Sequence, residues 1–64
     1  MRFNENLKKL RKEKGLTQKK LANEIYVSRT LITKYETGVV FPTKENIKRL
    51  AEFFGIKPHE LTLS

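Results

Sequence analysis

The stretch Leu16–Glu36, LTQKKLANEIYVSRTLITKYE, contains two short helical patterns with only two residues between them. Thr17 and Ser28 each stand at the start of one pattern, where a hydroxyl oxygen can accept a hydrogen bond from a free backbone N–H. An apolar pair flanks each cap at the spacing of a hydrophobic staple, Leu16 with Leu21 and Val27 with Ile32. The sequence therefore predicts two consecutive helices, the first beginning after Thr17 and the second covering residues 29–36.

The connection between these two helices consists of Tyr26 and Val27. It is too short for a loosely hinged pair, so the helices must cross at a steep angle. That geometry is a helix-turn-helix. The first of the two helices is expected to turn Leu21, Ala22 and Ile25 inward.

Apolar residues recur every three or four positions through most of the remaining chain, and no stretch alternates long enough to predict a strand. Further helices are expected from about Asn4 to Lys14, from Pro42-Thr43 to Phe54, and in a short turn that begins at Pro58. Every glycine follows a predicted helix end. The inward positions in these helices are Leu7, Leu10, Ile47, Leu50, Ala51, Phe54 and Leu61. The fold class is therefore expected to be all-α, with five helices in one domain, residues 1–64.

The positive charge is concentrated in the first half of the chain. Residues 1–34 hold ten of the fourteen Lys and Arg residues against three Glu, whereas residues 35–64 hold four of each sign. The whole net charge of +7 therefore lies in the first half, and it favours an anionic partner such as a nucleic acid.

The composition also narrows the class of protein. The chain has no cysteine, and no apolar run approaches the roughly 18 residues that a membrane span needs. We expect a cytoplasmic, nucleoid-associated protein that does not enter a membrane and uses no cofactor or metal. An enzyme is not expected, because the chain has no aspartate and its one histidine, His59, has only Glu60 as an acidic neighbour.

The segment Leu16–Glu36 resembles the helix-turn-helix of the Cro/cI-type (XRE) repressor family, and the resemblance extends over nearly the whole chain. It is carried by Thr17-Gln18, Leu21-Ala22, Val27-Ser28, Ile32-Thr33, Glu36, Gly38, Pro42 and the later run RLAEFFGIKPHEL. The resemblance implies a lambda-repressor-like bundle that binds double-stranded DNA and regulates transcription, most often as a repressor on a roughly palindromic operator.

The helix over 29–36 is the expected reader of DNA. If Ile32 faces inward, then at about 100° per residue a cationic, hydroxyl-bearing face points outward. Arg or Lys can donate to O6 and N7 of guanine in the major groove, and Thr can meet a polar edge or a thymine methyl. The resemblance implies base-reading roles for Arg29, Thr30, Thr33 and Lys34. Alternatively, these residues are simply the solvated side of a helix.

Contacts with the phosphate backbone are expected at helix starts, where free N–H groups and the positive helix end favour an anion. The resemblance implies this role for Gln18. The full set of expected phosphate contacts is Gln18, Ser28, Thr37, Lys44 and Asn46. Such contacts position a protein on DNA without reading its sequence.

The resemblance further implies an ion pair between Arg11 and Glu36, which would join the first helix to the end of the third. The alternative is that Arg11 belongs to the basic surface.

Two features depart from the family pattern. Tyr26 stands where the family usually has glycine, and the loop Val39–Phe41 lacks the basic residues that many members carry there. We expect this loop to fold back over the core.

Other functions remain open from the sequence. A homodimer is expected, and Phe53 with Leu63 could form its self-association patch. The main alternative is an antitoxin or other protein-interaction module that covers a protein partner with Val39, Val40, Phe41, Phe53 and the C-terminal turn. Binding to RNA or to a membrane surface is a third possibility. The shortage of exposed aromatic residues disfavours RNA, and the first helix has too few large apolar residues for a membrane surface.

Overall fold

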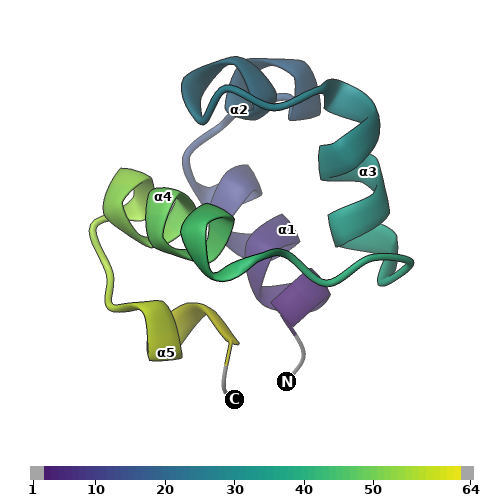
Figure 1. Cartoon of the computed structure of the whole chain (residues 1–64). Coiled ribbons are helices and arrows are strands. Elements are labelled where there is room, and N and C mark those ends of the chain that lie inside the picture. The colour runs from purple at the N-terminus through teal and green to yellow at the C-terminus, as the bar shows by residue number, and fades with distance from the viewer. Residues whose placement is uncertain (1–2, 63–64) are drawn as a thin grey trace.

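The computed structural model describes residues 3–62 and contains five α-helices there (Figure 1). Their bounds are α1 Phe3–Glu13, α2 Gln18–Glu24, α3 Arg29–Thr37, α4 Lys44–Phe54 and α5 Pro58–Thr62. Helix α1 packs against both α3 and α5, α2 packs against α3, and α4 packs against α5. The expected five-helix, all-α fold is confirmed.

Capping residues fix where the helices begin and end. The side chains of Thr17, Ser28 and Thr43 each accept a hydrogen bond from the backbone N–H three residues further on, at the starts of α2, α3 and α4. Gly38 and Gly55 end α3 and α4 in the left-handed conformation, with φ angles of 79° and 71°. The helix starts expected at Thr17, Ser28 and Thr43 are therefore confirmed.

The core contains one completely buried aliphatic residue from each helix, Leu7, Leu21, Ile32, Leu50 and Leu61. Because a Leu→Ala change in a core typically costs about 2–5 kcal/mol, each of these side chains carries a large share of the stability of so small a domain. The core thus depends on all five helices being present together, including the short α5.

Tyr35 is the largest of the fully buried side chains. Its ring lies edge-on to the ring of Phe3, with 5.8 Å between the ring centroids. Its hydroxyl oxygen accepts a hydrogen bond of 2.9 Å from the side-chain amide of Asn46. This buried phenol therefore ties α3 to the beginnings of α1 and α4.

Two details of the first helix and the α3–α4 loop differ from the sequence expectations. Helix α1 begins at Phe3, one residue earlier than expected, and Phe3 is buried. The expected folding-back of the loop is wrong for Val39 and Phe41, which are 71% and 65% exposed. The rings of Phe41 and Phe3 lie at 63° to each other with centroids 5.4 Å apart, and this contact leaves most of Phe41 in solvent.

The proposed self-association patch is only partly described. Phe53 is half-buried, packs against the core, and lies under the amino group of Lys14, which is 5.4 Å from the ring centroid. Leu63 lies outside the described residues. The part of this patch that the structure describes is therefore already engaged within the domain.

Tyr26 adopts a left-handed backbone conformation in the turn between α2 and α3, with φ at 63°. It is the one non-glycine residue with positive φ among residues 3–62. Its side chain is 85% exposed, so packing offers little compensation for the backbone strain. The turn therefore uses a conformation for which glycine is better suited.

We expect Tyr26→Gly to stabilise the domain by about 1 kcal/mol, because it removes the left-handed strain of a residue that buries little of its ring. For a domain of this size that corresponds to a rise in melting temperature of about 4–8 °C, measured by circular dichroism. Tyr26→Ala is the matched control, since it removes the ring and keeps the strain. A lower melting temperature in both variants would show instead that the ring stabilises the turn.

Candidate nucleic-acid interface

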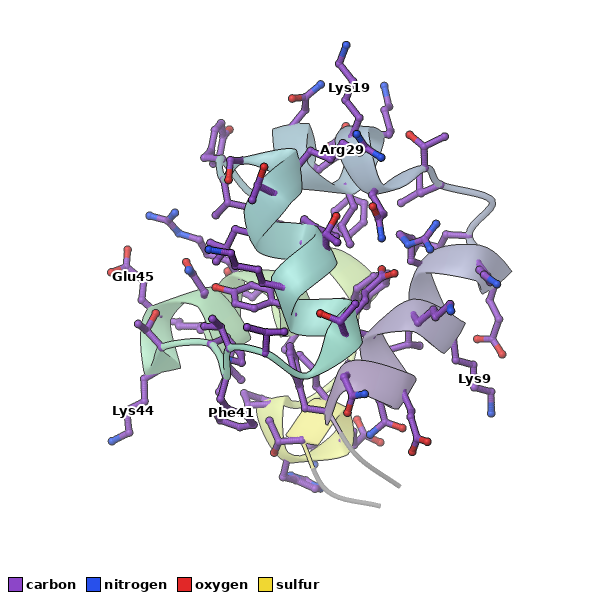
Figure 2. The ribbon with its side chains drawn as sticks, turned by 90° about the vertical axis from the view of Figure 1, so that its right-hand side faces the viewer. Lys9, Lys19, Arg29, Phe41, Lys44 and Glu45 are labelled. Carbon is purple, nitrogen blue, oxygen red and sulfur yellow. The ribbon has the colours of Figure 1, made fainter. Side chains whose placement is uncertain are left out.

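Helix α3 exposes one face along its length and buries the other. Ile32, Tyr35 and Glu36 are buried against the rest of the domain. On the opposite face Arg29, Thr30, Lys34 and Thr37 are exposed and Thr33 is half-buried. Figure 2 shows this helix toward the viewer, with Arg29 at its beginning. The structure thus brings all four expected base-reading side chains to one open helix face.

The positive surface extends from α3 onto the start of α2. Lys19 and Lys20 follow Gln18 in the first turn of α2, and both are exposed. Figure 2 shows Lys19 and Arg29 at the same end of the molecule, whereas Lys9 points away on α1. This end of the domain therefore presents cations from two helices to any anionic partner that contacts α3.

Arg11 and Glu36 form a two-point ion pair between α1 and α3. Arg11 Nε lies 2.5 Å from Glu36 Oε2, and Arg11 Nη2 lies 3.0 Å from Glu36 Oε1. The third guanidinium nitrogen, Nη1, donates to the carbonyl oxygen of Leu16 at 2.7 Å. The side chains are only 11% and 3% exposed, so Arg11 is not part of the open basic surface.

Gln18 extends this network to the open face of α3. Its amide nitrogen donates to Glu36 Oε1 at 3.1 Å, and its amide oxygen accepts from the Thr33 hydroxyl at 2.8 Å. The buried ion pair, the first residue of α2 and the middle of α3 are thus connected by side-chain hydrogen bonds. The sequence predicts DNA contacts for Gln18 and Thr33 but not the bond between them, because a spacing of 15 residues gives no local signal.

This network limits what the two side chains can offer a ligand. The Thr33 hydroxyl hydrogen is directed within the protein, which leaves its oxygen lone pairs and its methyl group outward. Gln18 keeps one amide N–H that is not bonded to Glu36. While the network stays intact, Gln18 can donate one further hydrogen bond, and Thr33 can accept one or offer its methyl group.

The other residues expected to contact DNA phosphates differ from Gln18 in their surroundings. Ser28 caps α3, and the Thr37 hydroxyl donates to the carbonyl oxygen of Thr33 at 2.9 Å. The Asn46 amide donates to Tyr35, which leaves it one free N–H. Lys44 is exposed at the start of α4, and Figure 2 shows it at the opposite end of the molecule from Lys19 and Arg29. The expected contacts therefore lie at both ends of α3 rather than in one cluster.

Within residues 3–62, the side chains considered for catalysis or metal binding either have structural roles or do not gather into a site. Glu60 accepts a hydrogen bond of 2.8 Å from the backbone N–H of Lys57, which caps α5. Within residues 3–62, no three His, Cys, Asp or Glu side chains come together as a metal site would require. Over the same residues, every helix is too short or too polar to cross a membrane.

Three comparisons place the chain among known proteins. A family model described as a helix-turn-helix domain matches residues 4–63. The chain is 48% identical over 61 residues to the HTH-type transcriptional activator BcrR of Enterococcus faecalis, covering 95% of this chain and 30% of BcrR. It is 39% identical over 61 residues to the cryptic phage CTXphi transcriptional repressor RstR of Vibrio cholerae, covering 95% of this chain and 54% of RstR. The chain therefore spans about a third to a half of the length of these relatives.

The fold is shared with a solved repressor structure. The P22 c2 repressor protein, in a crystal structure with a synthetic operator, matches with a TM-score of 0.93 at 24% identity. The match covers 98% of this chain and 96% of the P22 c2 chain. At this identity the comparison shows a common arrangement of the five helices.

The buried ion pair should be strongly coupled in a double-mutant cycle. We expect Arg11→Met or Glu36→Gln alone to lower the free energy of unfolding by about 3–5 kcal/mol, because each leaves its partner buried without compensation. The double variant should lose clearly less than the sum of the two single losses. The measurement is urea unfolding followed by circular dichroism.

The matched control for this cycle is the exposed pair Arg49–Glu45, whose atoms lie 2.7 Å apart on α4 with side chains 41% and 70% exposed. Its coupling is expected to stay below about 0.5 kcal/mol, as is usual for exposed pairs one helical turn apart. Equal coupling in the two cycles would contradict a special role for the Arg11–Glu36 pair.

Proposed function

Because the chain belongs to the helix-turn-helix domain family, we propose that it is a sequence-specific regulator of transcription that binds double-stranded DNA through α3. The observation that carries this proposal is the open face of α3, on which Arg29, Thr30, Thr33 and Lys34 stand together. An α-helix with such a face fits the major groove, where the edges of all four base pairs can be distinguished. Two relatives of similar sequence are named as a transcriptional activator and a transcriptional repressor, which supports this class of function.

Each residue of the α3 face has a distinct proposed contact. Arg29 and Lys34 donate to O6 and N7 of guanine, and an arginine can do so with two parallel hydrogen bonds. Thr30 and Thr33 contact thymine methyl groups or polar base edges. Because the Thr33 hydroxyl already donates to Gln18, its contact with a base is through its methyl group or as a hydrogen-bond acceptor.

The phosphate contacts hold α3 in register with the bases. The DNA backbone on the two sides of the groove would be reached by Lys44 at the start of α4 and by the residues around Ser28 at the start of α3. Their separation in the structure is consistent with these contacts. Gln18 contributes its remaining amide N–H, and Thr37 and Asn46 complete the set. These contacts supply affinity that does not depend on the DNA sequence.

The proposed regulator acts as a homodimer on a roughly palindromic operator, as is common for major-groove readers of this kind. It acts on DNA in the cytoplasm and carries out no catalysis. Since similar domains occur in both an activator and a repressor, the sign of regulation depends on where the operator lies relative to a promoter. We propose repression by occupation of the promoter as the simplest mode for this domain.

Selection of bound duplexes from a random DNA pool tests the reading role of Arg29. We expect the wild type to enrich an inverted repeat, and Arg29→Ala to relax one symmetric base position with a loss of about 1–3 kcal/mol there. Lys9→Ala is the matched control, because it removes the same charge from an exposed site on α1 (Figure 2). Unchanged base preference in Arg29→Ala would argue against this role, and no enrichment by the wild type would argue against sequence-specific binding.

The salt dependence of binding tests the phosphate contacts. With about six to eight phosphates neutralised per dimer, the logarithm of the affinity should fall against the logarithm of the salt concentration with a slope of roughly −5 to −7. Lys44→Gln should make this slope shallower by about 2, one contact per copy, for every duplex sequence. Lys57→Gln, at another exposed lysine, should leave the slope unchanged, and a flat response of the wild type would contradict binding to duplex DNA.

A further inference from the structure

The side-chain amide of Gln18 lies between two partners of different hydrogen-bonding character. Its nitrogen donates to Glu36 Oε1 at 3.1 Å, and its oxygen accepts from the Thr33 hydroxyl at 2.8 Å. An ionised carboxylate accepts hydrogen bonds and donates none, so only the NH2 end of an amide can face it. The carboxylate of Glu36 therefore determines which way round the Gln18 amide lies, and it turns the amide oxygen toward Thr33.

The Glu36 carboxylate that orients this amide is itself held in place. Its two oxygens accept from Nε and Nη2 of Arg11. Both side chains of the pair are largely buried, so neither can turn out to solvent without leaving the other charge uncompensated. Gln18 thus has a fixed acceptor on its inner side, and the orientation of its amide follows from the packing of α1 against α3.

The oriented amide in turn limits what the Thr33 hydroxyl can do. A hydroxyl has one hydrogen to donate and two lone pairs that accept. The Thr33 hydrogen has two acceptors inside the protein, Gln18 Oε1 at 2.8 Å and the more distant carbonyl oxygen of Arg29 at 3.2 Å. Thr33 is half-buried on the outward face of α3, so this hydroxyl can accept a hydrogen bond from a ligand but has no hydrogen left to donate.

Thr30 provides a contrast on the same face of α3. It is exposed, and within residues 3–62 its hydroxyl has no hydrogen-bond partner. The Thr30 hydroxyl can therefore rotate to donate or to accept, and it suits either kind of base edge. Of the two threonines on this face, only Thr33 has its hydrogen-bonding direction imposed by the fold.

The bases offer hydrogen-bond donors at only two kinds of position in the major groove. Adenine presents the amino group N6 and cytosine the amino group N4, whereas guanine O6 and N7 and thymine O4 are acceptors. Every base pair therefore has one amino-bearing base, on one strand or the other. A hydroxyl that can only accept bonds to the amino-bearing base, but at guanine or thymine it places two acceptors opposite each other and leaves both unpaired.

We propose that Thr33 reads an amino-bearing base, adenine or cytosine, on the strand that it contacts, and that Gln18 is the positioning residue that imposes this choice. The proposal rests on the proposed function, since it assigns the base that one residue of the α3 face recognises. Binding to DNA preserves the arrangement, because phosphate oxygens also only accept. The second N–H of Gln18 can donate to a phosphate while the amide oxygen still faces Thr33.

Selection of bound duplexes with two variants of Thr33 tests the reading role. Thr33→Val keeps the methyl group and the shape but removes the hydroxyl, whereas Thr33→Ser keeps the hydroxyl and removes the methyl group. At one symmetric position we expect the wild type to prefer adenine and cytosine over guanine and thymine by about two- to tenfold, the range for one hydrogen bond. Thr33→Ser should keep this preference, and Thr33→Val should lose it.

Thr30→Val is the matched control, because it makes the same change on the same helix face and should leave that position unaltered. Circular dichroism verifies that each variant is folded. A preference for guanine or thymine at the position that Thr33→Val relaxes would overturn the proposal. A selection in which Thr33→Val relaxes no position, or in which Thr33→Ser relaxes the same position as fully, would overturn it as well.

Gln18→Ala tests the positioning role apart from the overall affinity. It takes away the nearer acceptor of the Thr33 hydroxyl, which can then turn and donate to guanine or thymine. We expect the preference for amino-bearing bases at the Thr33 position to fall by at least about twofold, while the loss of a phosphate contact weakens binding to every duplex alike. Lys19→Ala is the matched control, because it removes an exposed cation beside Gln18 and should weaken binding without changing the preference. An unchanged preference in Gln18→Ala would overturn the positioning role.

The same selections separate failure of this proposal from failure of the proposed function. If the wild type enriches a motif that Arg29→Ala relaxes and Thr33→Val does not, sequence-specific binding stands and the assignment of Thr33 fails. If the wild type enriches no sequence, both fail, because there is then no base for Thr33 to read.

Discussion

The buried ion pair between Arg11 and Glu36 is the constraint on which the arrangement of the first three helices depends. Two charges that are largely removed from water are tolerated only when their hydrogen-bonding groups are satisfied. Here the guanidinium also bonds to Leu16 and the carboxylate to Gln18, and no buried side-chain polar atom in the described part of the chain lacks a partner. Since these partners come from α1, the α1–α2 connection, α2 and α3, the pair is satisfied only in this one arrangement of the helices.

This constraint connects the interior of the domain to its proposed DNA-binding face. The chain of hydrogen bonds continues from Glu36 to Gln18 and from Gln18 to Thr33. A rigid, pre-oriented surface binds its ligand with a smaller loss of conformational entropy than a flexible one. The network therefore helps to explain how a chain of 64 residues can hold the short helix α3 in a fixed position.

The two ends of α3 differ in chemistry as well as in position. Arg29 and the neighbouring Lys19 make its beginning cationic, whereas the uncharged residues 37–43 follow its end. Tyr26, which precedes the helix, retains a strained backbone and an exposed ring without a visible packing reason. The beginning of α3 is therefore cationic, and an uncharged, apolar loop follows its end.

The sequence by itself determined the five helices and the inward positions, because caps, glycines and apolar spacing act within a few residues of the chain. It also placed Arg29 and Lys34 on one helix face, since helical periodicity fixes that geometry. Only the tertiary structure decided that Gln18 bonds to Thr33, that Asn46 bonds to Tyr35, and that the loop after α3 stays exposed. Contacts between helices depend on the distance and the angle at which the helices cross. The packing of the whole core sets both.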